Sequence, residues 1–367
     1  MKKKIALYIP TLNGGGAERV MLTLANSLAE KGILIDLVLN KLEGPYIKDI
    51  SKKVNIVELK TSRAIASIIP LAQYINNNRP DTILSAMNYI NVVTIMAKTL
   101  SVTNTKVIIS EHSHLSSSLT QRNNAFSSKV LRFLMKISYP YAEGIVAVSN
   151  SVADDLVMQL GISRKRITTI YNPIVSHSML EKANNVIINQ NLLPSASKII
   201  ISVGRLVHEK NFSMLIKAFN KVQKQIDSKL LILGEGYAEA ELKLLVEQLN
   251  LVDKVKFIGF VDNPYVWMKN ADLLVLSSNY EGFGNVLVEA MACGTPVIST
   301  NCPGGPYEIL EGGKWGELVA VGNDDQLSNA IITSLTNPSH ISSDDLKKRA
   351  SKFSVENAIN KYLDILV

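Results

Sequence analysis

Two stretches decide the fold: Ile5-Ala-Leu-Tyr-Ile9, which leads into a glycine-rich turn, and Lys198-Ile-Ile-Ile-Ser-Val203, which leads into Gly204. Both stretches are short and apolar, and an amphipathic segment follows each turn. A strand that is apolar on both faces is typical of a parallel sheet covered by helices on either side. We therefore predict that each stretch is the first strand of its own doubly wound α/β domain.

The first half of the chain repeats this alternation of strand and helix. Val20, Leu24 and Leu28 share one face of a predicted helix at 17–31, and Gly32 is placed to cap its C-terminus. Five further strands are predicted after it, at 34–39, 54–59, 82–84, 106–110 and 144–148. These strands and the helices between them predict one parallel sheet within residues 1–173.

The second half repeats the pattern after a break. Residues 174–198 contain two short runs of Asn, Pro194 and no strong period, which is typical of a linker. The predicted elements that follow are strands at 198–203, 230–233, 255–258, 273–276 and 296–299, and helices at 214–225, 237–249 and 286–291. We therefore predict domains at 1–173 and 174–350, with ligands bound at the carboxyl ends of the strands. A last helix at about 352–367 has an apolar face that needs a partner.

Composition excludes several classes of protein. The 367 residues are 47% hydrophobic and 19% charged, which excludes a disordered chain. Cys293 and Cys302 are too few for a disulfide framework or a zinc site. The apolar stretch after Lys4 is too short for a signal peptide, and no run approaches the ~18 residues of a spanning helix. We expect a cytoplasmic protein that is not integral to a membrane.

Charge is distributed unevenly between the two halves. Residues 1–173 carry 21 Lys and Arg against 11 Asp and Glu, whereas residues 174–367 carry 18 against 21. A basic first half beside a slightly acidic second half suggests that the two halves face different partners. Scattered solvated lysines are the alternative explanation.

The first glycine-rich turn is Asn13-Gly14-Gly15-Gly16-Ala17-Glu18-Arg19. Glycines between a strand and a helix let backbone amides approach an anion at the positive helix end. A dinucleotide-binding fingerprint needs glycine where Arg19 stands, and Asp36, about 20 residues on, lies inside its strand. NAD binding is therefore disfavoured, which leaves an anion-binding loop or a plain tight turn.

Two basic residues follow the first strand of the second domain. Arg205 comes directly after Gly204, and Lys210 lies at the start of the next helix. Arg as a planar fork and Lys as a mobile point charge could converge on one anion. Two ordinary surface charges are the alternative. The position after the domain's first strand favours phosphate binding.

The most informative stretch is Ser278-Asn-Tyr-Glu281-Gly-Phe-Gly284-Asn-Val-Leu-Val-Glu289. Two glycines bracket a turn into a helix, whose first amides predict an anion site: Asn285, Val286 and Leu287. Glu281 and Glu289 could be an acid/base pair for glycoside hydrolysis. A phosphate at the same helix end would instead leave them as acceptors for sugar and ribose hydroxyls. They could also simply complement the helix dipole.

These motifs together closely resemble the family 4 retaining glycosyltransferases of GT-B fold, and the Gly-Gly-Gly-Ala-Glu-Arg turn resembles the subgroup that builds bacterial surface polysaccharides. The motifs are Gly204-Arg205 with Lys210, Gly234-Glu-Gly236, Gly259-Phe-Val, Glu281-x7-Glu289 and Ala292-Cys-Gly-Thr-Pro-Val-Ile298. The resemblance spans nearly the whole chain. It implies an acceptor-binding Rossmann-like domain at 1–173, a nucleotide-sugar-binding one at 174–350, a cleft between them, and a last helix packed on the first domain.

The resemblance also implies roles for single residues. Arg205 and Lys210 would bind the donor diphosphate and stabilise it as the leaving group, Glu281 would hold the donor sugar, and Glu289 would accept the ribose hydroxyls. The other implied donor-binding residues are Gly15, Gly16, Gly204, Phe260, Val261, Gly284, Asn285, Val286 and Leu287. His112 would stand against the transferred sugar, with His114 as the neighbouring alternative.

The activity implied by the resemblance is retaining transfer of a hexose or N-acetylhexosamine from a nucleotide sugar, UDP-linked, to a saccharide or polyprenyl-diphosphate-linked acceptor in capsule or lipopolysaccharide synthesis. No Asp-x-Asp occurs in the sequence, so we expect no metal cofactor, and Arg205, Lys210 and a helix end would supply positive charge instead. We expect no nucleic-acid partner. The alternatives are a GT-B-type sugar-nucleotide epimerase, which needs no acceptor, and a catalytically silent scaffold of the same fold.

A basic helix is predicted at 129–137. Lys129, Arg132 and Lys136 share one face of it, and the apolar contacts around them are Leu131, Phe133, Leu134 and Met135. An ordinary surface helix with its apolar side in the core is the alternative. Because the first half is basic, we predict reversible peripheral binding of this helix to the anionic inner face of the cell membrane.

Overall fold

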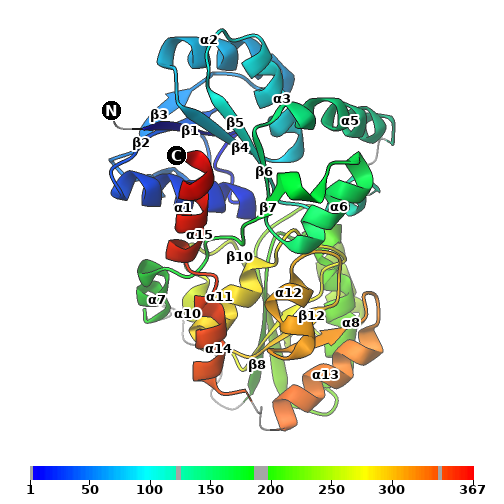
Figure 1. Ribbon diagram of the computed structural model, residues 1–367. Coiled ribbons are helices and arrows are strands. Elements are labelled where there is room, and N and C mark those ends of the chain that lie inside the picture. Colours follow the sequence, from blue (N-terminus) through cyan, green and yellow to red (C-terminus); the bar gives the residue numbers. More distant parts are fainter. Residues whose placement is uncertain (1–2, 121–124, 186–196, 338–340) are drawn as a thin grey trace. The chain divides into compact units, whose positions relative to one another are not determined.

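The computed structural model describes residues 3–120, 125–185, 197–337 and 341–367 (Figure 1). The chain forms two compact units, Met1–Pro173 with Val355–Val367, and Ile174–Ser354. Each unit contains one parallel sheet with helices interleaved between its strands, so the predicted pair of doubly wound domains is confirmed. The second unit extends to Ser354, a few residues beyond the predicted boundary at 350.

The sheet of the first unit has the strand order β3-β2-β1-β4-β5-β6-β7, and every pair is parallel. Its strands are β1 (Lys4–Ile9), β2 (Leu34–Leu39), β3 (Asn55–Glu58), β4 (Thr82–Ala86), β5 (Lys106–Glu111), β6 (Gly144–Ala147) and β7 (Ile167–Thr169). The six predicted strands are all present. The seventh, β7, was not predicted because three edge residues carry too little periodicity.

The helices of the first unit follow the strands in alternation. The α-helices are α1 (Gly16–Glu30), α2 (Ile68–Asn78), α3 (Asn88–Thr99), α4 (Leu115–Thr120), α5 (Ala125–Ser138), α6 (Asn150–Leu160) and α15 (Val355–Leu366). The 3-10 turns are η1 (Pro45–Asp49), η2 (Ala64–Ser67), η3 (Tyr139–Tyr141) and η4 (Arg164–Arg166).

The last helix, α15, shares the core of the first unit. Ala358 and Tyr362 are buried in one apolar cluster with residues of α1 and β1, and Ile365 packs partly buried against it. Figure 1 shows α15, in red, beside α1, in blue. The hydroxyl of Thr82 donates to the carbonyl of Leu366 at 2.9 Å, which ties the chain's end to β4.

The sheet of the second unit has the order β10-β9-β8-β11-β12-β13, again all parallel. Its strands are β8 (Lys198–Val203), β9 (Ser228–Leu233), β10 (Val255–Gly259), β11 (Leu273–Leu276), β12 (Val297–Thr300) and β13 (Glu317–Val319). Its helices are α7 (His177–Ala183), α8 (Phe212–Val222), α9 (Glu239–Gln248), α10 (Tyr265–Lys269), α11 (Asn285–Cys293), α12 (Pro306–Ile309), α13 (Asp324–Thr336) and α14 (Ser343–Ser351), with 3-10 turns η6 (His208–Lys210) and η7 (Glu311–Gly313).

The predicted linker at 174–198 is partly wrong. It contains the helix α7, whose N-cap Ser176 accepts a hydrogen bond from the amide of Met179 at 3.1 Å. Met179 and Ala183 are buried, so packing stabilises a helix that is too short to show a clear period in sequence. Residues 186–196 of the predicted linker lie outside the described residues.

Both sheets change winding direction at one point, between β1 and β4 in the first unit and between β8 and β11 in the second. At such a switch point the loops after the two strands diverge and leave a crevice for a ligand. In the second unit these are the loops that carry Lys210 and Glu281. The topology therefore positions the residues singled out in the sequence.

Candidate active site

The loop after β8 depends on close approaches between backbones. A Cβ on Gly234 would lie 2.0 Å from the carbonyl oxygen of Gly204, and Gly234 has φ +131°, so only glycine fits there. A Cβ added at Gly204 would lie 3.6 Å from the aliphatic stem of Lys210, an ordinary van der Waals distance. Arg205 is exposed directly after Gly204. The close approach of Gly234 to Gly204 therefore sets the path of the loop that carries both basic residues.

Lys210 and Glu281 meet at the switch point of the second sheet. The Nζ of Lys210 lies 2.5 Å from Oε1 of Glu281, and the hydroxyl of Ser278 donates to the same oxygen at 2.6 Å. Both charged side chains are largely shielded from solvent, so their attraction is less screened than that of a surface pair. Ser277 donates to the carbonyl of Lys210 at 2.8 Å and holds the two loops together. Sequence reasoning missed both serines, although Ser278 begins the most informative motif.

Two asparagines brace the same pair of loops. The side chain of Asn211 donates to Asn279 at 2.9 Å, and the amide of Asn279 donates to the carbonyl of Glu209 at 2.8 Å. Asn211 has φ +47° and caps α8, a conformation that Asn tolerates better than most residues. The Lys210 loop is therefore fixed at several points before any ligand binds.

The helix α11 begins at this site, with its N-cap Gly284 at φ +97°. The amide of Leu287 donates to the carbonyl of Gly284 at 3.0 Å, so the chain tightens into a 3-10 turn there. Its role as a ligand donor stays a prediction. Asn285 and Val286 are the first two residues of the helix. Glu289 lies one turn inside the helix and is 5% exposed.

The loop after β10 contains Phe260 and Val261. Phe260 is exposed, and its amide donates to Oε1 of Glu235 at 3.2 Å. Gly234 pairs with Gly259 through a hydrogen bond of 2.8 Å, which places the loops after β9 and β10 side by side. Glu235 stands in one of the sequence motifs but was given no role there, because only its contact with Phe260 shows that it holds this loop.

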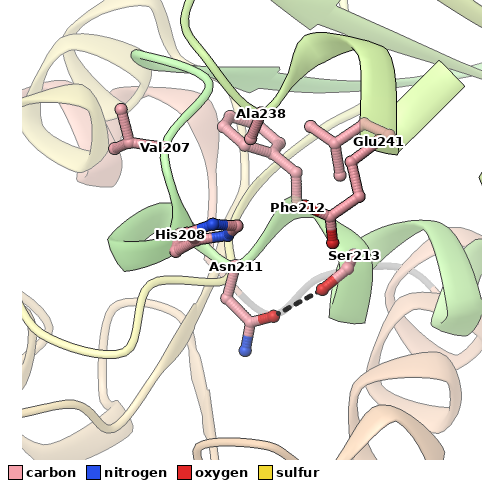
Figure 2. Close-up of a pocket in the computed structure, with 8 residues that line it drawn as sticks. Val207, His208, Asn211, Phe212, Ser213, Ala238 and Glu241 are labelled. Carbon is pink, nitrogen blue, oxygen red and sulfur yellow. Dashed lines mark hydrogen bonds between the residues drawn. The ribbon is translucent and has the colours of Figure 1, made fainter. Parts of the chain in front are cut away.

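A small pocket of about 30 Å³ lies at the start of α8 (Figure 2). The residues that line it are Val207, His208, Asn211, Phe212, Ser213, Ala238, Glu241 and Leu242. Ser213 donates to Asn211 at 3.0 Å on its wall (Figure 2). This volume fits a water molecule and excludes a nucleotide. The pocket is therefore a small gap in the packing beside the loop after β8, and it is not the donor site.

In the first unit, Gly15 is the N-cap of α1 and Gly16 its first residue. A Cβ on Gly15 would lie 2.2 Å from Oε2 of Glu18. The carboxylate of Glu18 therefore lies over the positive end of α1, where it complements the helix dipole. A phosphate bound by the amides of Gly15 and Gly16 would meet this carboxylate.

The two candidate histidines follow β5, and their surroundings differ. The Nε2 of His112 lies 2.9 Å from the hydroxyl of Ser110, while its buried Nδ1 has no partner among the described residues. Burial lowers the pKa of His112 to about 4, so the ring is neutral at pH 7. His114 contacts Ser116, Ser117 and Asp155.

The end of β5 also contains a buried carboxyl group that the sequence did not single out. Glu111 accepts hydrogen bonds from the hydroxyl of Tyr139 and, at 2.8 Å, from Asn91. Burial raises the pKa of Glu111 to about 7, although these two hydrogen bonds oppose the shift. Glu111 precedes His112 directly, so this network fixes the backbone from which the histidine projects.

The helix α5 presents an apolar stripe to solvent. The α5 stripe consists of four exposed residues at spacings of three and four: Phe126, Val130, Phe133 and Ile137. The side chain of Phe133 is 62% exposed. Lys129, Arg132 and Lys136 are exposed beside this α5 stripe. The sequence-based assignment of apolar contacts was wrong in part, since Met135 is buried and Leu131 and Leu134 are partly buried. Of these, only Met135 is fully shielded from solvent.

The described part of the chain offers no cluster of side chains suited to a metal ion: no group of three or more His, Cys, Asp and Glu residues in it could hold one. Among the same residues, no helix has both the length and the apolar character that crossing a bilayer requires.

Comparison with known proteins agrees with this geometry. Residues 14–176 match the family model "Glycosyltransferase Family 4", and residues 184–353 match "Glycosyl transferases group 1". The chain is 32% identical, over 91% of its length and 90% of the relative's, to N-acetylgalactosamine-N,N'-diacetylbacillosaminyl-diphospho-undecaprenol 4-alpha-N-acetylgalactosaminyltransferase of Campylobacter jejuni. It is 25% identical, over the whole of both chains, to amylovoran biosynthesis glycosyltransferase AmsD of Erwinia amylovora.

Solved structures with the same architecture include Alr3699/HepE of Anabaena in complex with UDP-glucose, with a TM-score of 0.81 and 22% identity over 99% of both chains. Sucrose-phosphate synthase of Thermosynechococcus elongatus matches with a TM-score of 0.85 and 20% identity, over 99% of this chain and 98% of that one. These likenesses establish the GT-B fold. With the family models and the close relative, they show that the chain is a glycosyltransferase and belongs to glycosyltransferase family 4.

Proposed function

We propose that this glycosyltransferase moves a hexose or N-acetylhexosamine from a UDP-sugar, with retention at the anomeric carbon, to a saccharide or lipid-linked saccharide in cell-surface polysaccharide synthesis. The observation that carries the proposal is the meeting of Lys210, Glu281 and Ser278 beside the N-terminus of α11. A cation, a helix end and a carboxylate together suit a diphosphate with an attached sugar. The Campylobacter relative, whose name gives an undecaprenol-linked acceptor, supports the acceptor class.

The second unit would bind the donor. Arg205 and Lys210 neutralise the diphosphate and stabilise it as it leaves, with the amides of Asn285 and Val286 as further donors. The carboxylate of Glu281 accepts hydrogen bonds from hydroxyl groups of the sugar. The carboxylate of Glu289 accepts hydrogen bonds from the ribose hydroxyls. The backbone at Phe260 and Val261, where Glu235 holds the loop, reads the base; the loop glycines Gly204 and Gly284 bring main-chain atoms close to the ligand.

The first unit would bind the acceptor and contribute to chemistry through His112. A neutral imidazole with an uncommitted Nδ1 can donate or accept a hydrogen bond without bringing a charge to the sugar. His114 is less suited to this role because its Nδ1 contacts two serines and lies 3.5 Å from Asp155. Gly15 and Gly16 are proposed as amide donors to phosphate.

Transfer is proposed to need no metal ion. A diphosphate leaving group carries negative charge that must be stabilised as its bond to the sugar breaks. Arg205, Lys210 and the N-terminus of α11 are the positive groups that supply this stabilisation in our proposal.

We further propose that the protein binds reversibly to the inner face of the cell membrane through α5. The α5 stripe is apolar and faces solvent, while Lys129, Arg132 and Lys136 lie beside it. An exposed apolar face bordered by basic residues is typical of helices that lie in the interface of an anionic bilayer. Peripheral binding would bring the enzyme to a lipid-linked acceptor.

The deciding experiment incubates the protein with a panel of nucleotide sugars, with and without lipid-linked saccharide acceptors, and identifies the products by mass spectrometry and NMR. An acceptor-dependent product with the donor's anomeric configuration supports the proposal. Conversion of the donor without acceptor would identify an epimerase instead. If both Arg205→Ala and Glu289→Ala turned over donor at the wild-type rate, the proposed donor site would be rejected. If calorimetry showed no donor binding, the protein would be a catalytically silent scaffold instead of an enzyme.

A further inference from the structure

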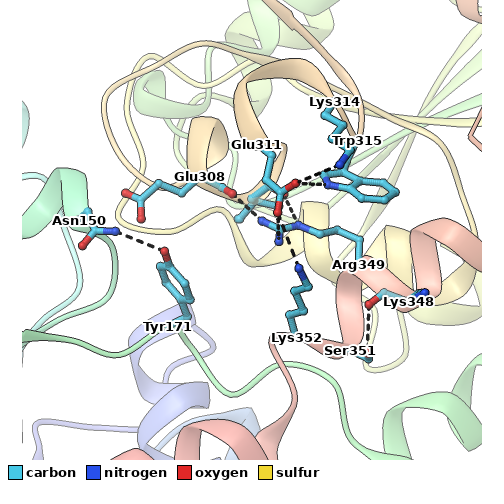
Figure 3. Close-up of polar contacts among 11 residues, drawn as sticks. Asn150, Tyr171, Glu308, Glu311, Lys314, Trp315, Lys348, Arg349, Ser351 and Lys352 are labelled. Carbon is cyan, nitrogen blue, oxygen red and sulfur yellow. Dashed lines mark hydrogen bonds and ion pairs between the residues drawn. The ribbon is translucent and has the colours of Figure 1, made fainter.

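Arg349, on α14, is a buried arginine outside the motifs singled out in the sequence. It is 7% exposed, and each of its guanidinium nitrogens donates a hydrogen bond (Figure 3). Nε donates to the carbonyl of Ile309 at 2.9 Å, and Nη2 donates to that of Glu308 at 2.7 Å. Nη1 pairs with Oε1 of Glu311 at 2.6 Å. One side chain therefore fastens α14 to α12 and η7.

The segment that Arg349 holds leads directly to the Glu281 loop. Two glycines precede α12, and a Cβ on Gly304 would lie 2.1 Å from the carbonyl oxygen of Glu281. A Cβ on Gly305 would lie 2.3 Å from the carbonyl oxygen of Phe283. The amide of Glu281 donates to the carbonyl of Pro303 at 2.9 Å. Because these contacts join main chain to main chain, a shift of α12 would move the backbone of Glu281.

A second route connects Arg349 to the same loop. Its guanidinium lies over the ring of Phe353, 4.9 Å from the centroid. Phe353 meets Phe283 edge to face, with centroids 5.5 Å apart. Both rings are almost fully buried, and Phe283 lies between Glu281 and the N-cap of α11 in sequence. Arg349 thus supports both ends of the turn that leads from Glu281 into α11.

We propose that Arg349 is a positioning residue for donor-sugar binding: it fixes the segment 303–313, which in turn fixes the carboxylate of Glu281 and the start of α11. The inference rests on the proposed function, because it assigns Glu281 to the donor sugar. Arg349 itself touches neither ligand nor reacting atom. Its effect passes through Gly304, Gly305 and Phe283.

The chemistry of arginine explains why this residue stands here. Two main-chain carbonyls and one carboxylate each accept a hydrogen bond from a different nitrogen of the guanidinium fork. Lysine has a single nitrogen and cannot reach all three acceptors at once. Methionine would leave the two carbonyls and Glu311 without these donors, which destabilises their present arrangement.

The test compares Arg349→Met and Arg349→Lys with a matched control, Lys352→Met. Lys352 is an exposed cation whose Nζ lies 3.9 Å from the same Glu311 carboxylate, so the control also removes one positive charge beside Glu311. For each folded variant, kcat and KM for UDP-sugar are measured well below its melting temperature, together with the Kd of UDP alone. Arg349→Met is expected to raise KM for the sugar donor about tenfold or more, since small misplacements of binding groups carry penalties of this size.

The Kd of UDP is expected to change several-fold less than that KM, because Glu281 contacts the sugar in the proposed site. Arg349→Lys should lie between wild type and Arg349→Met, and Lys352→Met should match wild type. A folded Arg349→Met or Arg349→Lys with a lower melting temperature but wild-type KM and kcat would overturn the inference. If Arg349→Met does not fold, Arg349→Lys decides the matter alone. Absence of turnover by the wild type would reject the proposed function and the inference together.

Discussion

Lys210 and Glu281, 71 positions apart in sequence, form an ion pair of 2.5 Å at the point where the second sheet changes winding direction. The pair forms because β8 and β11 are neighbours in the sheet and the loops after both strands reach the same edge. Glu281 therefore holds the very cation that we assign to the donor diphosphate. A bound diphosphate must share or take over that cation.

This competition predicts opposite effects on nucleotide and sugar. Glu281→Gln removes the carboxylate charge but keeps the shape and the acceptor for Ser278, so Lys210 becomes more available to phosphate. Glu281→Gln should bind UDP alone as tightly as wild type does, or several-fold more tightly. Its kcat/KM for UDP-sugar should fall at least about tenfold, because one hydrogen bond to a charged group is lost. Isothermal titration calorimetry and initial rates measure the two quantities.

The matched variant is Lys210→Met, which removes the cation and leaves Glu281 with its bond from Ser278. Both UDP affinity and turnover should fall in this variant. Weaker UDP binding in Glu281→Gln, to the same extent as in Lys210→Met, would contradict the competition between Glu281 and the diphosphate for Lys210.

Gly234→Ala is expected to destabilise the second unit strongly. The added Cβ would lie 2.0 Å from the carbonyl oxygen of Gly204 at φ +131°, so the loop after β8 must move. Gly322→Ala is the matched control, because Gly322 also has positive φ, +79°, but a Cβ added there would meet no neighbouring atom of the described chain within 4 Å. Urea unfolding should show a loss of about 1 kcal/mol for the control and clearly more for Gly234→Ala. Equal losses of unfolding free energy in the two variants would show that the loop relieves the clash with the Gly204 carbonyl without a loss of stability.

The sequence predicted strands best where an apolar run ends sharply. The limits of β2, β8 and β11 match the predicted ones at both ends, because these buried strands are largely apolar and end at polar or glycine-rich turns. The edge strands β7 and β13 were missed, since Ile167-Thr-Thr and Glu317-Leu-Val are three residues long and partly polar. Short edge strands are stabilised by pairing with a neighbour, which leaves little local signal.

The residues of the candidate site also divide into those that the sequence predicted and those that it missed. Lys210, Glu281 and Glu289 stand in motifs whose spacing is visible in the sequence, so they could be singled out before their contacts were known. Glu111 and Arg349 could not, because their importance lies in contacts with Tyr139, Asn91 and the carbonyls of α12, which are far away in the chain. Burial and long-range hydrogen bonds carry no local pattern.

Glu111 predicts a pH dependence of stability. Burial raises its folded pKa from the ordinary 4.5 to about 7, so between these values the folded state binds more protons than the unfolded state. The free energy of unfolding should therefore fall as pH rises through this window, by an amount on the order of 3 kcal/mol for this group. Glu111→Gln keeps an acceptor for Tyr139 and Asn91 but cannot ionise.

Denaturant unfolding of wild type and Glu111→Gln between pH 4.5 and pH 8.5 isolates this contribution, since other titrating groups are shared. The variant should gain stability relative to wild type as pH rises. A constant difference between the two proteins across this range would mean that Glu111 ionises near its ordinary pKa.

Donor turnover should not depend on a divalent cation. In the proposed site Arg205, Lys210 and the N-terminus of α11 supply the positive charge at the diphosphate. Protein treated with EDTA and assayed in EDTA should keep its full kcat/KM, with a bound-metal assay by mass spectrometry as the control. Loss of activity in EDTA that is restored by magnesium or manganese would count directly against the roles given to Arg205 and Lys210.

The α5 stripe and its basic neighbours predict salt-dependent binding to anionic vesicles. Each basic residue near an anionic surface contributes about 1 kcal/mol, so reversing Lys129, Arg132 and Lys136 to Glu should weaken binding at least about 100-fold. Phe133→Ser with Ile137→Ser should also weaken it, because both side chains are exposed on the stripe. Flotation with vesicles of phosphatidylglycerol and phosphatidylcholine measures both effects, and rising salt should reduce binding of the wild type.

The matched control reverses three other exposed lysines of the first unit, Lys31, Lys41 and Lys52, to Glu. This variant has the same net charge as the α5 triple variant, so general electrostatic attraction changes equally in both. Retained binding in the control with loss in the α5 variant would locate the membrane contact on α5. Equal weakening in both would instead indicate attraction by the basic domain as a whole, and binding that survives the α5 reversal would reject membrane docking through this helix.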